Sequence, residues 1–335
     1  MTYFAKKSNL KNLLRVLISL SLASVILWFV FKNIDVDGAI KTILSTNIKW
    51  ILISGLFSII AHIARGARWK LMMEPLGIQT KTISTTVAVL NGYLANLVFP
   101  RAGEVARCAS LQKMEGIPVE KSFGVVIAER VFDLLVLMVL IFVNLALEFN
   151  RLKAFFADFF SKKLNLSGNL MLYFGVFALV VMAVVLLFLK FKSKILANQY
   201  VAKIYTFGLT LWEGFTSVTK LKNPWLFVFY TIAIWLMYYC AAYILFFSMP
   251  ASQNLTMLAG LTILVMGSIG MAAPTQGGIG TYHYLVGNIV VLYGLSLQDG
   301  IVLATFLHAT QTIFVIIFGI LAMIYSAFIT KKDAS

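Results

Sequence analysis

Apolar residues occur along this chain in long runs, separated by short segments in which lysines and arginines gather. The runs cover residues 13–31, 48–64, 82–100, 122–147, 164–189 and 225–247. Runs of about 17–25 residues are long enough to cross a hydrocarbon core as a helix. The first run is followed by Lys32-Asn33-Ile34-Asp35 and not by a small-residue cleavage site, which favours an uncleaved helix over a signal peptide. The pattern predicts a multi-pass helical membrane protein.

The second half of the chain contains 76 consecutive residues, Asn223 to Gln298, without Asp, Glu, Lys or Arg. One helix of that length would reach roughly 114 Å, against a hydrocarbon core of roughly 30 Å, so the stretch has to fold back. Prolines mark the expected breaks, at Met249-Pro250 and Ala273-Pro274. Glycines 277, 278 and 280 follow the second break. They predict an open loop at membrane depth and a re-entrant or broken segment over 274–293.

The distribution of lysine and arginine indicates how the runs are oriented. If every run crossed the membrane, the two sides would receive 12 and 13 of these residues, which is no bias. If residues 82–112 enter and return on one side, the division becomes 18 against 7. Because cytoplasmic loops carry the excess of positive charge, this count favours a re-entrant hairpin and a cytoplasmic N-terminus. Segment 65–81 would then be cytoplasmic, with Arg65 and Arg68 in the last turn of the preceding helix.

The two proline breaks resemble one another, since each follows an apolar run and precedes a short helix-compatible segment. They read Phe99-Pro100-Arg101-Ala102-Gly103 and Ala273-Pro274-Thr275-Gln276-Gly277. Paired interrupted segments in two halves of a membrane protein point to a transporter's binding site. We therefore predict one all-α membrane domain over 1–335, with about seven or eight membrane segments, including two re-entrant hairpins. Its halves, about 10–150 and 164–330, would form an inverted repeat.

Composition supports this class. Apolar residues make up 60% of the chain and charged residues 12%, about half the roughly 25% of soluble proteins. These values exclude a disordered chain and a disulfide-rich secreted scaffold. The net charge of +15 is explained by cytoplasmic loops facing anionic lipid and does not indicate a nucleic-acid partner. Cys108 and Cys240 lie far apart, so neither a disulfide nor a metal site is expected, and we expect no cofactor.

The run 122–147 carries three ionisable residues, Glu129, Arg130 and Asp133. A charge at the bilayer centre costs from roughly 2.5–3.5 kcal/mol upward, so each needs a partner. Arg130 and Asp133 are i,i+3 neighbours and can pair. Glu129 and Asp133 share one helix face and need a further cation or a proton.

The candidate cations are Arg101 and Arg107 of the re-entrant segment, with Glu104 midway between them. Two interpretations follow. The charges form an ion-pair network that locks two helices together, or they line a polar cavity that binds a charged headgroup, as intramembrane charges commonly do. The two interpretations are compatible if the network lines the cavity.

The stretch Gly277-Gly278-Ile279-Gly280-Thr281 leads into a helix-compatible segment. Glycines allow close backbone approach, and free N–H groups at a helix start favour an anion, so the stretch could cradle a phosphate. A packing bend between helices is an equal alternative. No Gly-Lys-Ser/Thr follows, so this is not a nucleotide-binding P-loop. His283 is a cavity candidate, His62 and His308 are interpreted as packing residues, and three scattered histidines indicate no metal.

Together these motifs resemble the lysylphosphatidylglycerol synthase transmembrane-region family, also described as flippase-like membrane proteins. The resemblance covers roughly residues 10–328 and rests on Arg65-Gly66-Ala67-Arg68-Trp69, Pro100-Arg101-Ala102-Gly103-Glu104 with Arg107, Glu129-Arg130 with Asp133, and Gly277-Gly278-Ile279-Gly280. The best-known members fuse this membrane unit to a soluble domain that attaches an amino acid to phosphatidylglycerol. In these members the membrane unit is associated with moving the product lipid across the bilayer. Because the resemblance covers the membrane unit, it implies lipid movement and not lipid synthesis. Many members carry Glu where this chain has His283, and an acidic group suits a cationic headgroup better than a histidine does.

From these observations we expect a flippase or scramblase of the cytoplasmic membrane. It would move a phospholipid, with or without an aminoacyl or polyprenyl group, through a polar groove, without ATP because no Walker motif is present. The candidate substrate-binding residues are Arg101, Glu104, Arg107, Glu129, Arg130, Asp133, Gly277, Gly278, Gly280 and His283. One alternative is a membrane transferase acting on a polyprenyl-phosphate sugar, with Asp35 and Asp37 in an external loop. Another is a non-transporting partner of a separately encoded lipid synthase, and a homo-oligomer is also open.

Overall fold

The computed structural model describes residues 28, 36–99, 101–149, 151, 153, 221–273 and 275–332. The predicted spans 13–31 and 164–189 therefore lie outside the described residues, apart from Trp28. Within the described part, the regular secondary structure is helical and contains no strand, which confirms the all-α class. The α-helices are α2 (Val36–Leu44), α3 (Ile48–Met73), α4 (Thr82–Val98), α5 (Gly103–Glu115), α6 (Val119–Leu147), α10 (Pro224–Tyr243), α11 (Met257–Ala272), α12 (Thr281–Ile289) and α13 (Leu297–Lys332).

Short 3₁₀ segments extend or connect these helices: η1 (Glu74–Leu76), η3 (Ile244–Ser248), η4 (Gln276–Gly278) and η5 (Val290–Tyr293). Three of the described helical stretches are long and apolar enough to cross a membrane, namely Ile48–Leu76, Pro224–Ser248 and Leu297–Ile329. Helix α6 has 29 residues, a sufficient length, but carries the charged residues noted above. These lengths fit the predicted membrane class.

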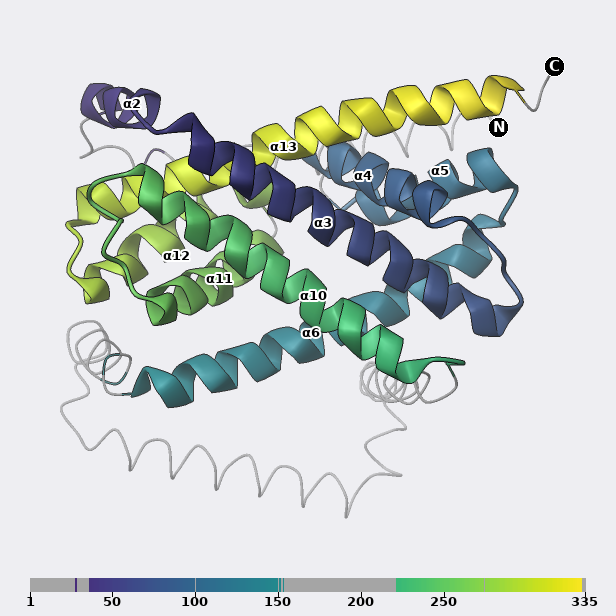
Figure 1. The fold of residues 1–335 in the computed structure, drawn as a ribbon, viewed down its shortest axis with the longest axis horizontal. Helices are drawn as coiled ribbons and strands as arrows, with labels where there is room; N and C mark the ends of the chain where they lie inside the picture. Colours follow the sequence, from purple (N-terminus) through teal and green to yellow (C-terminus); the bar gives the residue numbers. More distant parts are fainter. Residues whose placement is uncertain are drawn as a thin grey trace, which may run out of the picture.

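A long helix, a pair of short helices and a second long helix follow one another twice. The first set is α3, α4–α5 and α6, and the second is α10, α11–α12 and α13. Figure 1 shows the short pairs in opposite halves of the molecule, α4–α5 at the right and α11–α12 at the left, with the long helices running past both. Helix α3 packs on α10, α4 on α13 and α11 on α6, so the sets interlock.

Each set encloses its own apolar core. One cluster of buried side chains surrounds Trp69 and is built mainly by α3, α4, α5 and α6. The other surrounds Phe306 and is built mainly by η3, α11, α12 and α13. The apolar outer surfaces of the long helices remain exposed, as in α13, where Ile313, Leu321 and Phe328 are among the exposed residues. Such surfaces are expected where lipid surrounds the protein.

The proline breaks have the predicted physical cause. The residue before a proline is pushed out of the helical region by the ring of the proline. Phe99 ends α4 with φ −124° and ψ 112°, and Ala273 ends α11 with φ −61° and ψ 154°. Met249 ends η3 in the same extended way. Pro100 and Pro274 themselves lie outside the described residues.

Helices α4 and α5 form a hairpin, which we call the first hairpin. They have 17 and 13 residues, or about 26 Å and 20 Å at 1.5 Å per residue, less than a hydrocarbon core of roughly 30 Å. Gly92 and Gly103 allow the two backbones to touch, because a Cβ on Gly92 would lie 2.7 Å from the Gly103 carbonyl oxygen. The Lys81 N–H donates to the Glu115 carboxylate at 3.3 Å. The hairpin therefore ends beside its own beginning.

Helices α11 and α12 form the second hairpin. Tyr282 of α12 lies against the glycine face of α11, and the hydroxyls of Thr262 and Tyr293 are 2.6 Å apart near the open end. The connecting loop carries Gly277, Gly278 and Gly280, all with positive φ. This is the irregular loop that the glycines predicted. The broken segment predicted over 274–293 is the loop and second arm of a hairpin whose first arm is α11.

The two hairpins meet at their tips. The side-chain amide of Gln276 donates to the carbonyl oxygens of Leu97 and Val98, at 2.6 Å and 3.1 Å. Carbonyls in the last turn of a helix lack intrahelical partners, so Gln276 caps the end of α4. The two proline breaks, separated by more than 170 residues, are thereby brought together.

We expect Gly92→Ala to destabilise the first hairpin. The new methyl would push on the Gly103 carbonyl and on the backbone-anchored Cβ of Arg107, which lies 3.0 Å from its position. Overpacking of this kind costs about 1–3 kcal/mol, so the midpoint of thermal unfolding in detergent should fall by several degrees. Gly124→Ala on α6 is the matched control, because its Cβ would meet nothing within 4 Å. Equal midpoints for the two variants would contradict the close backbone contact.

Candidate functional site

Arg65 and Arg68 do not lie at a helix end. Helix α3 continues to Met73, and the two side chains are 4% and 0% exposed, so the expectation of a cytoplasmic last turn is wrong. The apolar run stops at these arginines, but the helix continues because carboxylates of α6 neutralise them. Arg107 is buried as well. Removing these three arginines from the loop count of 18 leaves 15 against 7, so the predicted orientation keeps its support.

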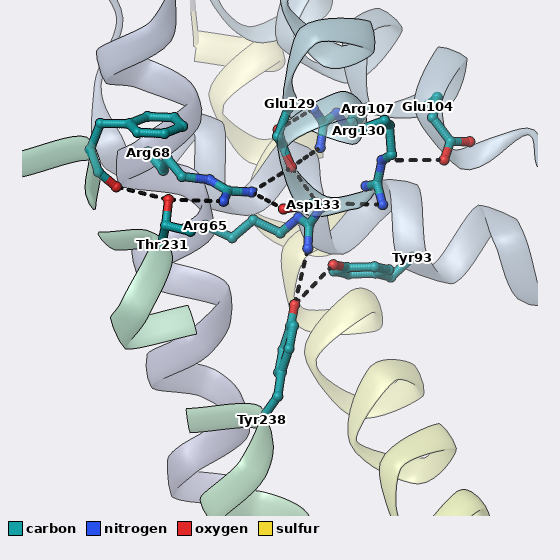
Figure 2. Close-up of polar contacts among 11 residues, drawn as sticks. Arg65, Arg68, Tyr93, Glu104, Arg107, Glu129, Arg130, Asp133, Thr231 and Tyr238 are labelled. Carbon is teal, nitrogen blue, oxygen red and sulfur yellow. Dashed lines mark hydrogen bonds and ion pairs between the residues drawn. The ribbon is translucent and has the colours of Figure 1, made fainter. Parts of the chain in front are cut away.

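Glu129 stands at the centre of the charged residues and is 0% exposed. Its Oε1 lies 2.7 Å from Nη2 of Arg65 and 3.5 Å from Nη2 of Arg68. Its Oε2 lies 2.6 Å from Nη2 of Arg107 (Figure 2). Three guanidinium groups from two other helices thus surround one carboxylate. Buried charges persist only when they are paired in this way.

Asp133 lies one helical turn beyond Glu129 on α6 and shares two of the same arginines. Its Oδ1 is 2.5 Å from Arg68, and its Oδ2 contacts Arg65. The prediction that Glu129 and Asp133 share a face and need further cations is confirmed. The predicted pair of Arg130 with Asp133 is the loosest of these contacts, at 3.9 Å.

Only one of the two predicted cations of the re-entrant segment joins these carboxylates. Arg107 does so, whereas Arg101 is exposed and pairs with no carboxylate of the described residues. The reason is that α5 begins only at Gly103, which leaves Arg101 before the helix with φ +63°. Arg65 and Arg68 occupy the place expected for Arg101. Arg65 and Arg68 are three residues apart, which places both on one face of a helix, and this spacing could have identified them as a pair of buried cations.

Polar groups from two more helices complete the surroundings of the arginines. Tyr238 and Thr231 of α10 accept hydrogen bonds from Arg65 and Arg68, each at 3.2 Å. The hydroxyl of Tyr93 on α4 lies 3.3 Å from that of Tyr238. The guanidinium of Arg107 lies 4.3 Å from the centroid of the Trp69 ring, a cation–π distance. The sequence did not single out Tyr238 or Thr231.

The outer edge of the site is looser. Arg130 is 42% exposed, and its Nε lies 3.7 Å from Oε1 of Glu104 on α5. Both residues line a narrow pocket together with Tyr93, Asn96 and Arg107. Its free space is about 10 Å³, enough for about one water molecule. Oε2 of Glu104 and Nε of Arg107 are buried there without a hydrogen-bond partner in the described part of the chain. We call the seven residues the charged cluster: Arg65, Arg68, Glu104, Arg107, Glu129, Arg130 and Asp133.

The glycine loop forms a separate group. His283 Nδ1 accepts from the N–H of Gly280 at 3.3 Å, and a ring nitrogen of His308 lies 2.8 Å from the Gly277 carbonyl oxygen. The two imidazole rings are 5.0 Å apart. The N–H of Ile279 donates to the carbonyl oxygen of Gln276 at 3.0 Å. The N–H groups of Ile279 and Gly280 therefore already have acceptors within the loop.

A family model described as the lysylphosphatidylglycerol synthase TM region matches residues 13–319. The chain belongs to this family.

Two curated relatives match shorter segments. The UPF0104 membrane protein MJ1595 of Methanocaldococcus jannaschii is 30% identical over 107 residues, which is 31% of this chain and 32% of that protein. The Glycosyltransferase AglD of Haloferax volcanii is 38% identical over 72 residues, which is 21% of this chain and 12% of that protein. The matches thus span about a third or less of each relative. No solved structure matches. Family membership establishes a membrane protein.

We expect Glu129→Ala to be strongly destabilising. Removing the central carboxylate leaves three buried arginines with only Asp133 between them, and breaking a buried ion pair from one side costs about 3–5 kcal/mol. The free energy of unfolding, measured by denaturant titration in mixed micelles, should fall by that amount. Glu120→Ala is the control, because this carboxylate is exposed in the first turn of the same helix, where its interaction with the helix dipole contributes about 0.3–1 kcal/mol. Equal losses for the two variants would show that the cluster does not stabilise the fold.

Proposed function

We propose that the protein moves a phospholipid across the cytoplasmic membrane as a flippase or scramblase. The headgroup would pass the exposed edge of the charged cluster while the acyl chains stay in the bilayer. The supporting observation is the depth of this cluster. Arg68 lies eight residues before Leu76 and Glu129 ten residues after Val119, about 12 Å and 15 Å from those helix ends. Ionisable groups at such depth usually mark a substrate path.

The proposal includes a membrane topology. Each hairpin would enter from one side and return to it, with the tips meeting inside the membrane. The two sets of helices would form an inverted repeat, the arrangement of many secondary transporters. The short lengths of the hairpin helices and the contact of Gln276 with α4 support this topology. The first hairpin would open to the cytoplasm, as the count of positive residues favours.

The same topology assigns the C-terminus to the cytoplasmic side. Ala322, near the end of α13, belongs to the apolar cluster around Trp69, whose other members include Leu111 of the first hairpin. The end of α13 thus lies at the end of the molecule where α3 ends and α5 ends. Lys331 and Lys332 close that helix. Their positive charge agrees with a cytoplasmic position.

Passage of a headgroup requires a path past the meeting tips. Among the described residues, the hydrogen bonds between the tips are the two of Gln276, and a protein hydrogen bond contributes a net of only about 0.5–1.5 kcal/mol. Parting the tips is therefore a small cost beside that of dismantling the buried ion pairs. We infer that the tips move and that the inner charged cluster stays fixed. An ion gradient, or the lipid gradient alone, would drive the movement.

A transferase is the second candidate, because one of the relatives is named a glycosyltransferase. The acidic residues proposed for it are Asp35, outside the described residues, and Asp37. Asp37 is exposed in the first turn of α2, where a carboxylate favourably meets the helix dipole. That position gives Asp37 a structural role that requires no catalytic one. Asp37→Asn separates the readings, since it should leave lipid movement unchanged and abolish a transferase that depends on this carboxylate.

Cysteine labelling tests the topology. In a variant lacking Cys108 and Cys240, single cysteines would replace exposed residues at the open ends of the hairpins: Gln79 and Glu120 for the first, Asn254 and Gln298 for the second. A membrane-impermeant maleimide added to intact cells should label positions 254 and 298 only. Positions 79 and 120 should react only in inside-out vesicles. Labelling of 79 and 120 from opposite sides would mean that the first hairpin crosses the membrane.

Lipid movement tests the function. In proteoliposomes with acyl-labelled phosphatidylglycerol, the protein should accelerate translocation, and Arg130→Ala should lower its rate at least tenfold. Arg130 is the half-exposed member of the cluster, so its removal leaves the buried ion pairs intact. Lys113→Ala is the matched control, because it removes one exposed positive charge from α5. Equal rates for Arg130→Ala and Lys113→Ala would exclude the cluster edge from the path.

A further inference from the structure

The charged cluster carries more positive than negative charge. Four arginines, Arg65, Arg68, Arg107 and Arg130, face three carboxylates, Glu104, Glu129 and Asp133, which leaves one net positive charge. Arg101, exposed just before α5, adds another positive charge close to the same hairpin. A site of this composition attracts an anion and repels a cation.

The inner carboxylates offer nothing to a cationic headgroup. Both oxygens of Glu129 and both oxygens of Asp133 contact arginines, at 2.7 Å or less for the closest partner of each. Both residues are at most 15% exposed. An ammonium group would have to displace a buried guanidinium to reach them. The amine of an aminoacylated lipid therefore has no acceptor in the inner part of the cluster.

The outer edge has the opposite character, with one cation held loosely and one acceptor without a donor. The contacts of Arg130, at 3.7 Å and 3.9 Å, exceed hydrogen-bond distance, so its N–H donors are available for a phosphate. Oε2 of Glu104 is buried beside it and lacks a hydrogen-bond partner among the described residues. The pocket has room for about one water molecule, so a headgroup hydroxyl that enters it can donate to this oxygen without bringing positive charge. A primary amine can donate too, but it adds a cation to a site that is already positive, and a quaternary ammonium has no N–H to donate.

We propose that the lipid handled by this site is anionic and carries a hydroxyl on its phosphate headgroup, as a glycerol or sugar phosphate does. Arg130 binds the phosphate, and Glu104 accepts a hydrogen bond from the hydroxyl. Amine-bearing headgroups, including aminoacylated ones, are disfavoured. This inference rests on the proposed function, because it names the substrate class of the same site.

Headgroup selectivity tests the inference. Purified protein in proteoliposomes would receive acyl-labelled phosphatidylglycerol, phosphatidylmethanol, phosphatidylethanolamine and lysylphosphatidylglycerol. We expect phosphatidylglycerol to move at least tenfold faster than the two amine-bearing lipids and several-fold faster than phosphatidylmethanol, which has the same charge but no hydroxyl. Glu104→Ala should remove the difference between phosphatidylglycerol and phosphatidylmethanol. Lys113→Ala should preserve it.

Retention of the same four lipids by the detergent-purified protein, measured by native mass spectrometry, distinguishes a failure of the proposed headgroup class from a failure of the proposed transport. Selective retention of phosphatidylglycerol without translocation of any lipid would sustain the headgroup class and overturn the transport proposal. Translocation or retention of lysylphosphatidylglycerol at the level of phosphatidylglycerol would overturn the headgroup class. A preference for phosphatidylglycerol over phosphatidylmethanol that survives Glu104→Ala would overturn the role of Glu104.

Discussion

A fully buried carboxylate in the middle of a membrane protein constrains everything around it. Glu129 can stay charged there only if cations approach it from several directions, and they come from α3 and α5 while the carboxylate itself lies on α6. These three elements are thereby fixed relative to one another at one point. Tyr238 and Thr231 extend the connection to α10. Helices that gain little from apolar contacts with each other in lipid are held here by charge and hydrogen bonds.

The sequence predicted those parts of this arrangement that depend on local spacing. Proline and glycine positions located both hairpin turns, because the residue before a proline avoids the helix and a positive φ favours glycine. The separation of Glu129 and Asp133 by one turn predicted a shared face. The partners of these carboxylates could not be derived in the same way, because Arg65 lies 68 residues from Asp133 and its role depends on which helices become neighbours. Counting Arg65 and Arg68 as loop charges was wrong for the same reason.

The two hairpins solve one structural problem in different ways. In the proposed topology, each places irregular backbone inside the membrane, where every polar group needs a partner. In the first hairpin, the amide oxygen of Asn96 accepts from the N–H of Gly103 at 2.7 Å, and Gln276 caps the last carbonyls of α4. In the second, His283 and His308 bond the loop of glycines. The first loop is thus completed partly by the second hairpin, so the tips depend on each other.

The two interpretations of the charged cluster, an ion-pair network and a binding site, are compatible when its residues are divided by exposure. The buried arginines are held by Glu129 and Asp133, and these ion pairs fix α3, α5 and α6 relative to one another. The buried residues nevertheless contribute to the outer edge, because three arginines and two carboxylates leave one net positive charge next to Arg130 and Glu104. An edge with only these two residues would be neutral. In the proposed transport, the buried network would therefore support binding through its charge while its contacts stabilise the fold, and its fixed geometry would keep this charge in place when the hairpin tips move.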